Sequence, residues 1–114
     1  MALQRSLRLS KEKDITRILS TPHRAENKSF RLFFRKNYLP QGRFAFLISK
    51  KVAKSSVKRN LLKRRAGEFI RRFYLSRFSG YDIVVFFKKE TAVLNKKSFY
   101  QELESVLRLV KNIN

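Results

Sequence analysis

The stretch KKVAKSSVKRNLLKRRAGEFIRR, residues 50–72, decides the fold and contains ten basic residues but a single acid. Its periodicity predicts a long helix from about Ser56 to Ser76, because apolar side chains recur within a face about 100° wide. The members of this apolar face are Leu62, Ala66, Phe69, Ile70 and Phe73. Asn60, Arg64 and Arg71 lie roughly opposite. We therefore expect the helix to pack its apolar face on a sheet and to turn a cationic face to solvent.

This cationic face carries more charge than an ordinary helix surface. Glu68 is the one acid of the segment and cannot neutralise ten cations, and like charges four residues apart destabilise a helix. Lys50, Lys51 and Lys54 lead into the helix N-terminus, where unpaired backbone N–H groups also attract phosphate. A solvated surface is the simpler interpretation, but this charge pattern favours a surface that binds a polyanion.

Strands are predicted on both sides of this helix. Residues 28–36 alternate, with one face formed by Phe30, Leu32 and Phe34 and the other by Arg31, Phe33 and Arg35. Residues 43–49 alternate too, and the short turn at residues 39–42 indicates that the two strands pair as a hairpin. Residues 23–27 can add a short edge strand. The nearly all-apolar residues 82–87 predict a buried central strand.

A short N-terminal helix precedes the strands. Ser10 can cap it, its apolar residues share one face, and Pro22 stops it. The apolar residues are Ile15, Ile18 and Leu19.

The last helix is expected from about Ser98 to Lys111, with Ser98 and Gln101 as a capping box. Its apolar stripe consists of Phe99, Leu103, Val106 and Val110. The resulting order, α-β-β-β-α-β-α, predicts an α+β fold with a small mixed sheet of about four strands in one domain, residues 1–114. The two long helices must cover one face of the sheet, and the first helix is too small to cover the other. Part of the face with Arg31, Phe33 and Arg35 is therefore expected to stay open to a ligand.

The charge of the whole chain favours a polyanionic partner. Twenty-eight Lys and Arg against eight Asp and Glu give a formal net charge of +20, which attracts nucleic acid first and anionic membrane second. The longest apolar stretch, residues 83–87, is too short to span a bilayer, so we expect no membrane partner. The N-terminus lacks the apolar core of a secretory signal and the chain has no cysteine. Both features are compatible with a cytoplasmic protein.

The sequence does not predict a catalytic site. A protein nuclease needs acids and bases gathered in one place, commonly carboxylates that hold metal ions. The eight acids are scattered along the chain, His23 is the one histidine, and there is no glycine-rich phosphate loop. We therefore expect neither catalytic residues nor a metal site in this chain.

Ser49-Lys-Lys-Val-Ala-Lys54, followed by Val57-Lys-Arg-Asn-Leu-Leu-Lys-Arg64, resembles the "RNR" stretch of the bacterial ribonuclease P protein family. That pattern is approximately S-K-K-V-G-x-A-V-x-R-N-R-x-K-R-x-x-R-E, at the end of a strand and the beginning of a helix. The matching positions are Arg59, Asn60, Lys63, Arg64 and Glu68. The positions that depart from it are Ala53, Leu61 and Gly67.

The similarity extends over nearly the whole chain. Leu9 to Ser20 is similar to the family's opening segment, with Ile15 and Leu19 at positions where that family usually has aromatic residues. Tyr81-Asp-Ile-Val-Val fits its D-x-V-V strand. The resemblance implies an α/β sandwich with a left-handed βαβ crossover around the basic helix, contrary to the usual right-handed rule.

The resemblance also implies a function. The chain would be the accessory subunit of an endoribonuclease, inactive alone, in which an RNA subunit carries the active site and its Mg²⁺ and removes the 5′ leader of precursor tRNA. No further protein partner is implied. The surface against the RNA subunit would consist of Lys50, Lys51, Lys54, Lys58, Arg59, Asn60, Lys63, Arg64 and Arg71. A cleft for the leader would be lined by Ile15, Leu19, Arg31, Phe33 and Arg35. A structural ribosomal protein, or another rRNA-binding protein, is the alternative of similar size and charge.

Overall fold

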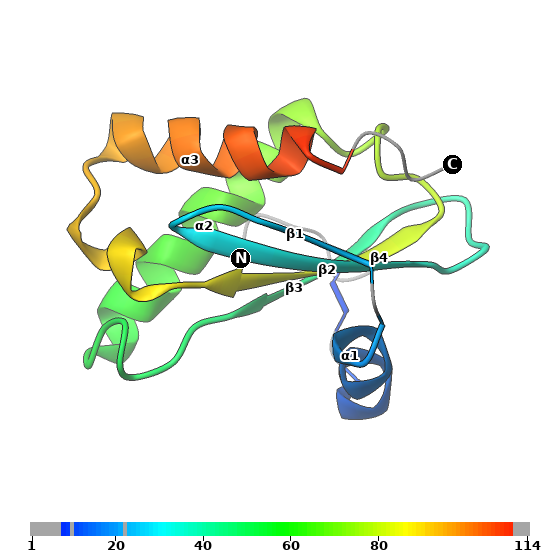
Figure 1. The fold of residues 1–114 in the computed structure, drawn as a ribbon, viewed down its shortest axis with the longest axis horizontal. Helices are drawn as coiled ribbons and strands as arrows, with labels where there is room; N and C mark the ends of the chain where they lie inside the picture. Colours follow the sequence, from blue (N-terminus) through cyan, green and yellow to red (C-terminus); the bar gives the residue numbers. More distant parts are fainter. Residues whose placement is uncertain (1–7, 10, 22, 111–114) are drawn as a thin grey trace.

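The computed structural model describes residues 8–9, 11–21 and 23–110. It has an α+β fold in which a four-stranded sheet lies between one short helix and a layer of two longer helices (Figure 1). The elements in chain order are α1 (Glu12–Leu19), β1 (Arg24–Glu26), β2 (Phe30–Lys36), β3 (Arg43–Leu47), α2 (Ser56–Phe73), β4 (Tyr81–Phe87), the 3₁₀ helix η2 (Lys89–Val93) and α3 (Lys96–Arg108). The predicted order of strands and α-helices, including the short edge strand, is confirmed.

Strand β4 occupies the centre of the sheet, whose order is β1-β2-β4-β3. It pairs antiparallel with β2 and parallel with β3. The predicted hairpin between residues 28–36 and 43–49 is therefore wrong. Because β4 is buried along almost its whole length, it takes the place that has neighbours on both sides. Strands β2 and β3 are therefore two strand spacings apart, about 9.6 Å. The loop of residues 37–42 spans this distance easily.

The sheet has two apolar faces, as the alternation in β2 predicted. Phe30 and Leu32 belong to the main core, which lies between the sheet and helices α2 and α3. Phe33 points to the other face and packs with Ile18 of α1 and with Val84. The alternation of side chains between the two faces therefore gives a large core on one side of the sheet and a small core under α1.

Helix α2 begins at the predicted residue, because the Ser55 hydroxyl accepts a hydrogen bond from the Lys58 N–H. It connects the neighbouring parallel strands β3 and β4 as a βαβ crossover. The left hand of that crossover stays a prediction. The helix ends at Phe73, short of the predicted Ser76, because Tyr74 leaves the helical conformation with φ −131°. Phe73 is 61% exposed, so its predicted place on the apolar face is wrong, and the buried Tyr74 packs there instead.

Helix α3 begins earlier than predicted. Asn95 caps it, with its side-chain Oδ1 accepting a hydrogen bond from the Ser98 N–H at 2.8 Å. The predicted capping box is wrong because the helix begins at Lys96, which places Ser98 inside the first turn. The predicted stripe is buried as expected at Phe99, Leu103, Val106 and Val110. Three predicted boundary residues lie outside the described part of the chain: Ser10, Pro22 and Lys111.

The loop before β3 is held against the turn before β4. A Cβ atom at Gly42 would lie 2.5 Å from the carbonyl oxygen of Phe78, so only glycine fits there. The Asn37 N–H donates to the Gly80 carbonyl oxygen at 2.8 Å. Gly80 itself has φ +84°, a conformation that glycine adopts without strain. These contacts fix the end of the sheet that lies beside α1.

Candidate nucleic-acid interface

The outer surface of α2 and the turn before it form the first candidate interface. None of the nine predicted RNA-binding residues in this region is buried. Asn60, Arg64 and Arg71 are all exposed, which confirms the predicted cationic face. Arg64 and Arg71 are separated by about 10 Å along the helix axis. The surface therefore presents an extended row of cations.

Arg59 has a structural contact that the sequence did not predict. Its Nη1 donates to the carbonyl oxygens of Ala53 at 2.8 Å and Lys54 at 2.9 Å. These bonds tie the turn before α2 to the first turn of the helix. Since a guanidinium has five N–H donors, the remaining ones are still available to a phosphate. Arg59 therefore orders the turn that carries Lys50, Lys51 and Lys54.

The two helix positions that depart from the RNR pattern differ in exposure. Leu61 is 37% exposed and places an apolar side chain beside the exposed Asn60. Gly67 is buried, so it contributes nothing to the outer surface of α2. Only position 61 is therefore accessible to a partner.

The second candidate interface lies on the opposite face of the sheet, beside α1 (Figure 1). Of the five residues predicted to line a cleft here, Ile15 and Phe33 pack in one apolar cluster. Arg35 is exposed and lines a cavity between α1 and the sheet. Leu19 is 37% exposed, and neither the cluster nor the cavity lining includes Leu19 or Arg31. The structure thus places Ile15 and Phe33 in one cluster and Arg35 in the neighbouring cavity, with Ile18 belonging to both.

Phe33 is less accessible than predicted. Its side chain lies on the expected face but is only 7% exposed. Arg24 is its neighbour in the β1–β2 register, and the Arg24 guanidinium lies 6.0 Å from the centre of the Phe33 ring. The sequence reasoning missed Arg24 because its contact with Phe33 depends on the pairing of the edge strand.

The cavity beside α1 contains a charged row that the sequence reasoning also missed. In the sheet register Asp82 lies between Arg35 and Arg43. The Asp82 carboxylate accepts hydrogen bonds from Arg43 Nε at 2.9 Å, Arg43 Nη2 at 2.7 Å and Asn37 Nδ2 at 2.8 Å. The hydrogen bonds from Arg43 to Asp82 raise the pKa of Arg43. The other residues around the cavity are Asp14, Arg17, Ile18, Lys36 and Tyr38.

This row fixes Arg43 while leaving Arg35 exposed. Asp82 is 7% exposed and its carboxylate is occupied by Arg43 and Asn37. It therefore offsets the charge of Arg43, and the charge of Arg35 faces solvent. A ligand in this cavity would meet the Arg35 cation at the end of β2. The strand order creates the row, and no local sequence pattern encodes that order.

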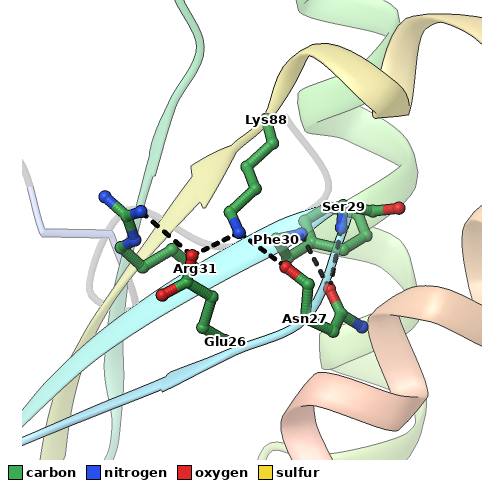
Figure 2. Close-up of polar contacts among 6 residues, drawn as sticks. All are labelled: Glu26, Asn27, Ser29, Phe30, Arg31 and Lys88. Atoms are coloured by element: carbon green, nitrogen blue, oxygen red, sulfur yellow. Dashed lines mark hydrogen bonds and ion pairs between the residues drawn. The ribbon is translucent and has the colours of Figure 1, made fainter.

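Arg31 is held by an ion-pair network at the β1–β2 turn (Figure 2). Its Nη2 lies 3.0 Å from Glu26 Oε2, and Lys88 Nζ also pairs with this oxygen. Lys88 Nζ further donates to the Asn27 carbonyl oxygen at 2.7 Å. The hydrogen bonds from Arg31, and then those from Lys88, lower the pKa of Glu26 to about 2. Arg31 is therefore partly neutralised, unlike Arg35.

Replacing Glu26 with glutamine is expected to lower the melting temperature at neutral pH, by an amount that diminishes as the pH falls through about 2. The pKa of Glu26 in the folded protein lies below its ordinary value of 4.5. The carboxylate therefore stabilises the fold above about pH 4.5, and this contribution is lost as the pH falls through about 2. Thermal denaturation followed by circular dichroism at several pH values measures the difference.

The matched control for this prediction is Glu104→Gln, which removes a carboxylate that lies 3.8 Å from Arg108 on the surface of α3. If Glu26→Gln and the unmodified protein have the same melting temperature at every pH, the network contributes nothing to stability.

The described residues contain no group of three or more His, Cys, Asp or Glu side chains placed to hold a metal ion. Within the same part of the chain, no helix is long and apolar enough to cross a membrane. The candidate interfaces are therefore basic surfaces, the cationic surface of α2 and the basic cavity beside α1.

Comparison with known proteins gives a consistent result. A family model described as Ribonuclease P matches residues 3–111. The ribonuclease P protein component of Streptococcus thermophilus is 28% identical over 109 residues, which cover 96% of each chain. That of Yersinia enterocolitica is 31% identical over 108 residues, covering 95% of this chain and 90% of the relative.

Solved structures of similar proteins share the fold. The RNase P protein from Staphylococcus aureus is 27% identical and superposes with a TM-score of 0.86, covering 95% of this chain and 98% of that one. The RNase P protein from Thermotoga maritima is 27% identical with a TM-score of 0.77, covering 94% of this chain and 97% of that one. The likeness spans almost the whole of each chain.

Proposed function

The chain belongs to the ribonuclease P protein family, and we propose that it is the non-catalytic subunit of this endoribonuclease. In this role it binds the RNA subunit through α2 and the 5′ leader of precursor tRNA beside α1. The observation that carries the proposal is the placement of two basic surfaces on opposite faces of one rigid sheet. A protein with two such surfaces can hold a catalytic RNA and its substrate at the same time.

The surface of α2 suits a folded RNA. Its cations are spread along a helix and the turn before it, and the Arg59 contacts with Ala53 and Lys54 keep that turn in place. Cations of this kind bind phosphates without reading base sequence. The predicted set, Lys50 to Arg71, therefore supports a large contact with the backbone of the RNA subunit.

The face beside α1 suits a single strand. It combines the apolar side chains Ile15 and Phe33 with the exposed cation of Arg35. Single-stranded RNA is commonly held by a basic groove together with aromatic or apolar platforms for its bases. We assign the leader to this face, with Leu19 and Arg31 as flanking contacts.

We assign catalysis and Mg²⁺ to the RNA subunit. The described acids do not form the donor set that a divalent cation needs, and the most buried carboxylate, Asp82, is already occupied by Arg43 and Asn37. The protein would act by neutralising phosphates and by positioning the leader. A cytoplasmic location, where bacterial tRNA precursors are made, follows from this role, and no other protein is needed for it.

The alternative, a structural ribosomal or other rRNA-binding protein, has no support from the family match. The two readings differ in what the protein does for precursor tRNA. Adding the protein to the RNA subunit at low Mg²⁺ is expected to restore cleavage of a leader-bearing precursor. Cleavage rates that are identical with and without the protein, over the full range of Mg²⁺ concentrations, would contradict the proposal.

A further inference from the structure

A second cavity, of about 380 Å³, lies where β2 leaves the sheet, next to the cavity beside α1. Four aromatic rings and two cations contribute to its lining, and no acid does. The lining residues are Thr21, His23, Phe34, Arg35, Lys36, Tyr38 and Tyr81. Aromatic rings beside cations form the combination that holds an unpaired base and its phosphate.

Two of the rings already form a stack. The His23 and Phe34 rings are 5.9 Å apart between centroids and inclined by 27°. The backbone also ties them, because the Phe34 N–H donates to the His23 carbonyl oxygen at 3.1 Å. His23 is exposed, so its outer ring face is accessible to a flat ligand.

Tyr38 supplies a ring that packing does not explain. It is 88% exposed, and its φ of 58° lies in the left-handed region that aromatic residues rarely adopt. Asn37 maintains this conformation, since its side-chain Oδ1 accepts the Leu39 N–H at 2.8 Å and its Nδ2 donates to Asp82 at 2.8 Å. The fold therefore holds a strained residue with its ring in solvent, an arrangement that is typical of functional positions.

The cavity is continuous with the cleft beside α1. Arg35, Lys36 and Tyr38 line both cavities. An RNA strand that lies beside α1 can therefore continue around the end of β2 with its phosphates near Arg35 and Lys36. A base that leaves the strand at this point would reach the rings of His23 and Tyr38.

We propose that this cavity binds one unpaired nucleobase of RNA, stacked on Tyr38 or His23, with its phosphate held by Arg35 and Lys36. The inference rests on the proposed function for the source of the RNA. It adds a base-binding site at the end of β2, next to the leader cleft. The base comes either from the leader or from an unpaired nucleotide of the RNA subunit.

The first test uses the protein without its RNA subunit. A short single-stranded oligonucleotide that carries 2-aminopurine is titrated with the protein, and stacking on a ring quenches the 2-aminopurine fluorescence. Tyr38→Asn is expected to reduce affinity about fivefold or more, the loss expected for one stacked base, and to reduce the quenching. Because asparagine tolerates positive φ, the melting temperature should stay the same or rise.

His23→Ala should reduce quenching in the same way, and Val93→Ala is the matched control. Val93 is 85% exposed on η2, and neither cavity beside β2 includes it. A base-paired hairpin should compete weakly, because its bases are not free to stack. Unchanged affinity and quenching for both Tyr38→Asn and His23→Ala would overturn the proposal.

The second test identifies the source of the base and separates this site from the proposed function. If the leader supplies the base, Tyr38→Asn weakens binding only of precursors whose leaders are long enough to reach the cavity. If the RNA subunit supplies it, the same variant weakens assembly equally for all substrates. Failure of the unmodified protein to bind the RNA subunit would count against the proposed function, whereas the oligonucleotide titration tests the cavity independently.

Discussion

Replacing Lys54, Lys63 and Arg64 together with glutamine will weaken binding to the RNA subunit on the order of a hundredfold or more at 0.1 M salt. Each phosphate contact releases counterions, so losing three should also flatten the slope of log affinity against log salt by about 2–3. These three side chains are not buried, and among the described residues none of them forms a hydrogen bond or an ion pair whose loss would confound the result. Filter binding across a salt series measures both quantities.

Arg59 is left intact in that variant because its contacts with Ala53 and Lys54 order the turn before α2. The matched control replaces three exposed cations that lie off α2: Lys28, Arg77 and Arg108. The control variant loses the same three positive charges, so the comparison separates the effect of where the cations lie from the effect of total charge. Equal weakening by the two triple variants would show that α2 is not a specific interface.

Replacing Phe33 with leucine will weaken binding of leader-bearing precursor about fivefold or more and leave mature tRNA unaffected. Leucine keeps most of the apolar packing with Ile18 and Val84 but removes the ring. The Arg24 guanidinium now covers that ring, and such a contact is worth about 0.5–1 kcal/mol near a surface. Stacking of a base is worth about 1–3 kcal/mol, so a leader nucleotide can displace Arg24.

The control for Phe33→Leu is Val84→Ala, which truncates the same buried cluster without removing a ring. Both variants should lose some thermal stability, but only Phe33→Leu should discriminate between precursor and mature tRNA. If precursor and mature tRNA lose affinity equally, Phe33 does not belong to the leader-binding face.

The elements that the sequence predicted correctly are those set by local patterns. The alternation in residues 30–36 assigned Phe30 and Leu32 to the main core and Phe33 to the opposite face, as the structure has them. The apolar run of β4 predicted a central strand, and it is central. The alternation of side chains and the length of an apolar run are local properties of the sequence, so they can be read before any tertiary contact is known.

The errors come from contacts between distant parts of the chain. The hairpin between the second and third strands fails because β4, almost forty residues later, is inserted between them. The same strand order creates the Arg35–Asp82–Arg43 row. The contact of Arg24 with Phe33 depends on the pairing of the edge strand. Phe73, the last residue of α2, is exposed although the periodicity placed it on the apolar face.

The candidate site divides in the same way. The cations of α2 follow from helical spacing, so their exposure could be predicted residue by residue. The hydrogen bonds from Arg59 to Ala53 and Lys54 could not be predicted, because they depend on the path of the turn that carries those two residues. The cavity at Tyr38 combines β2, its following loop and the beginning of β4, so no single segment of sequence reveals it.

The most direct test is to incubate leader-bearing precursor tRNA with protein that has been freed of all nucleic acid, over a wide range of Mg²⁺ concentrations. We predict no cleavage by this polypeptide, and accurate 5′ processing once the RNA subunit is added back. Removal of the leader by the polypeptide alone, at a rate that follows protein concentration through purification, would contradict the division between a protein that binds RNA and an RNA that performs hydrolysis.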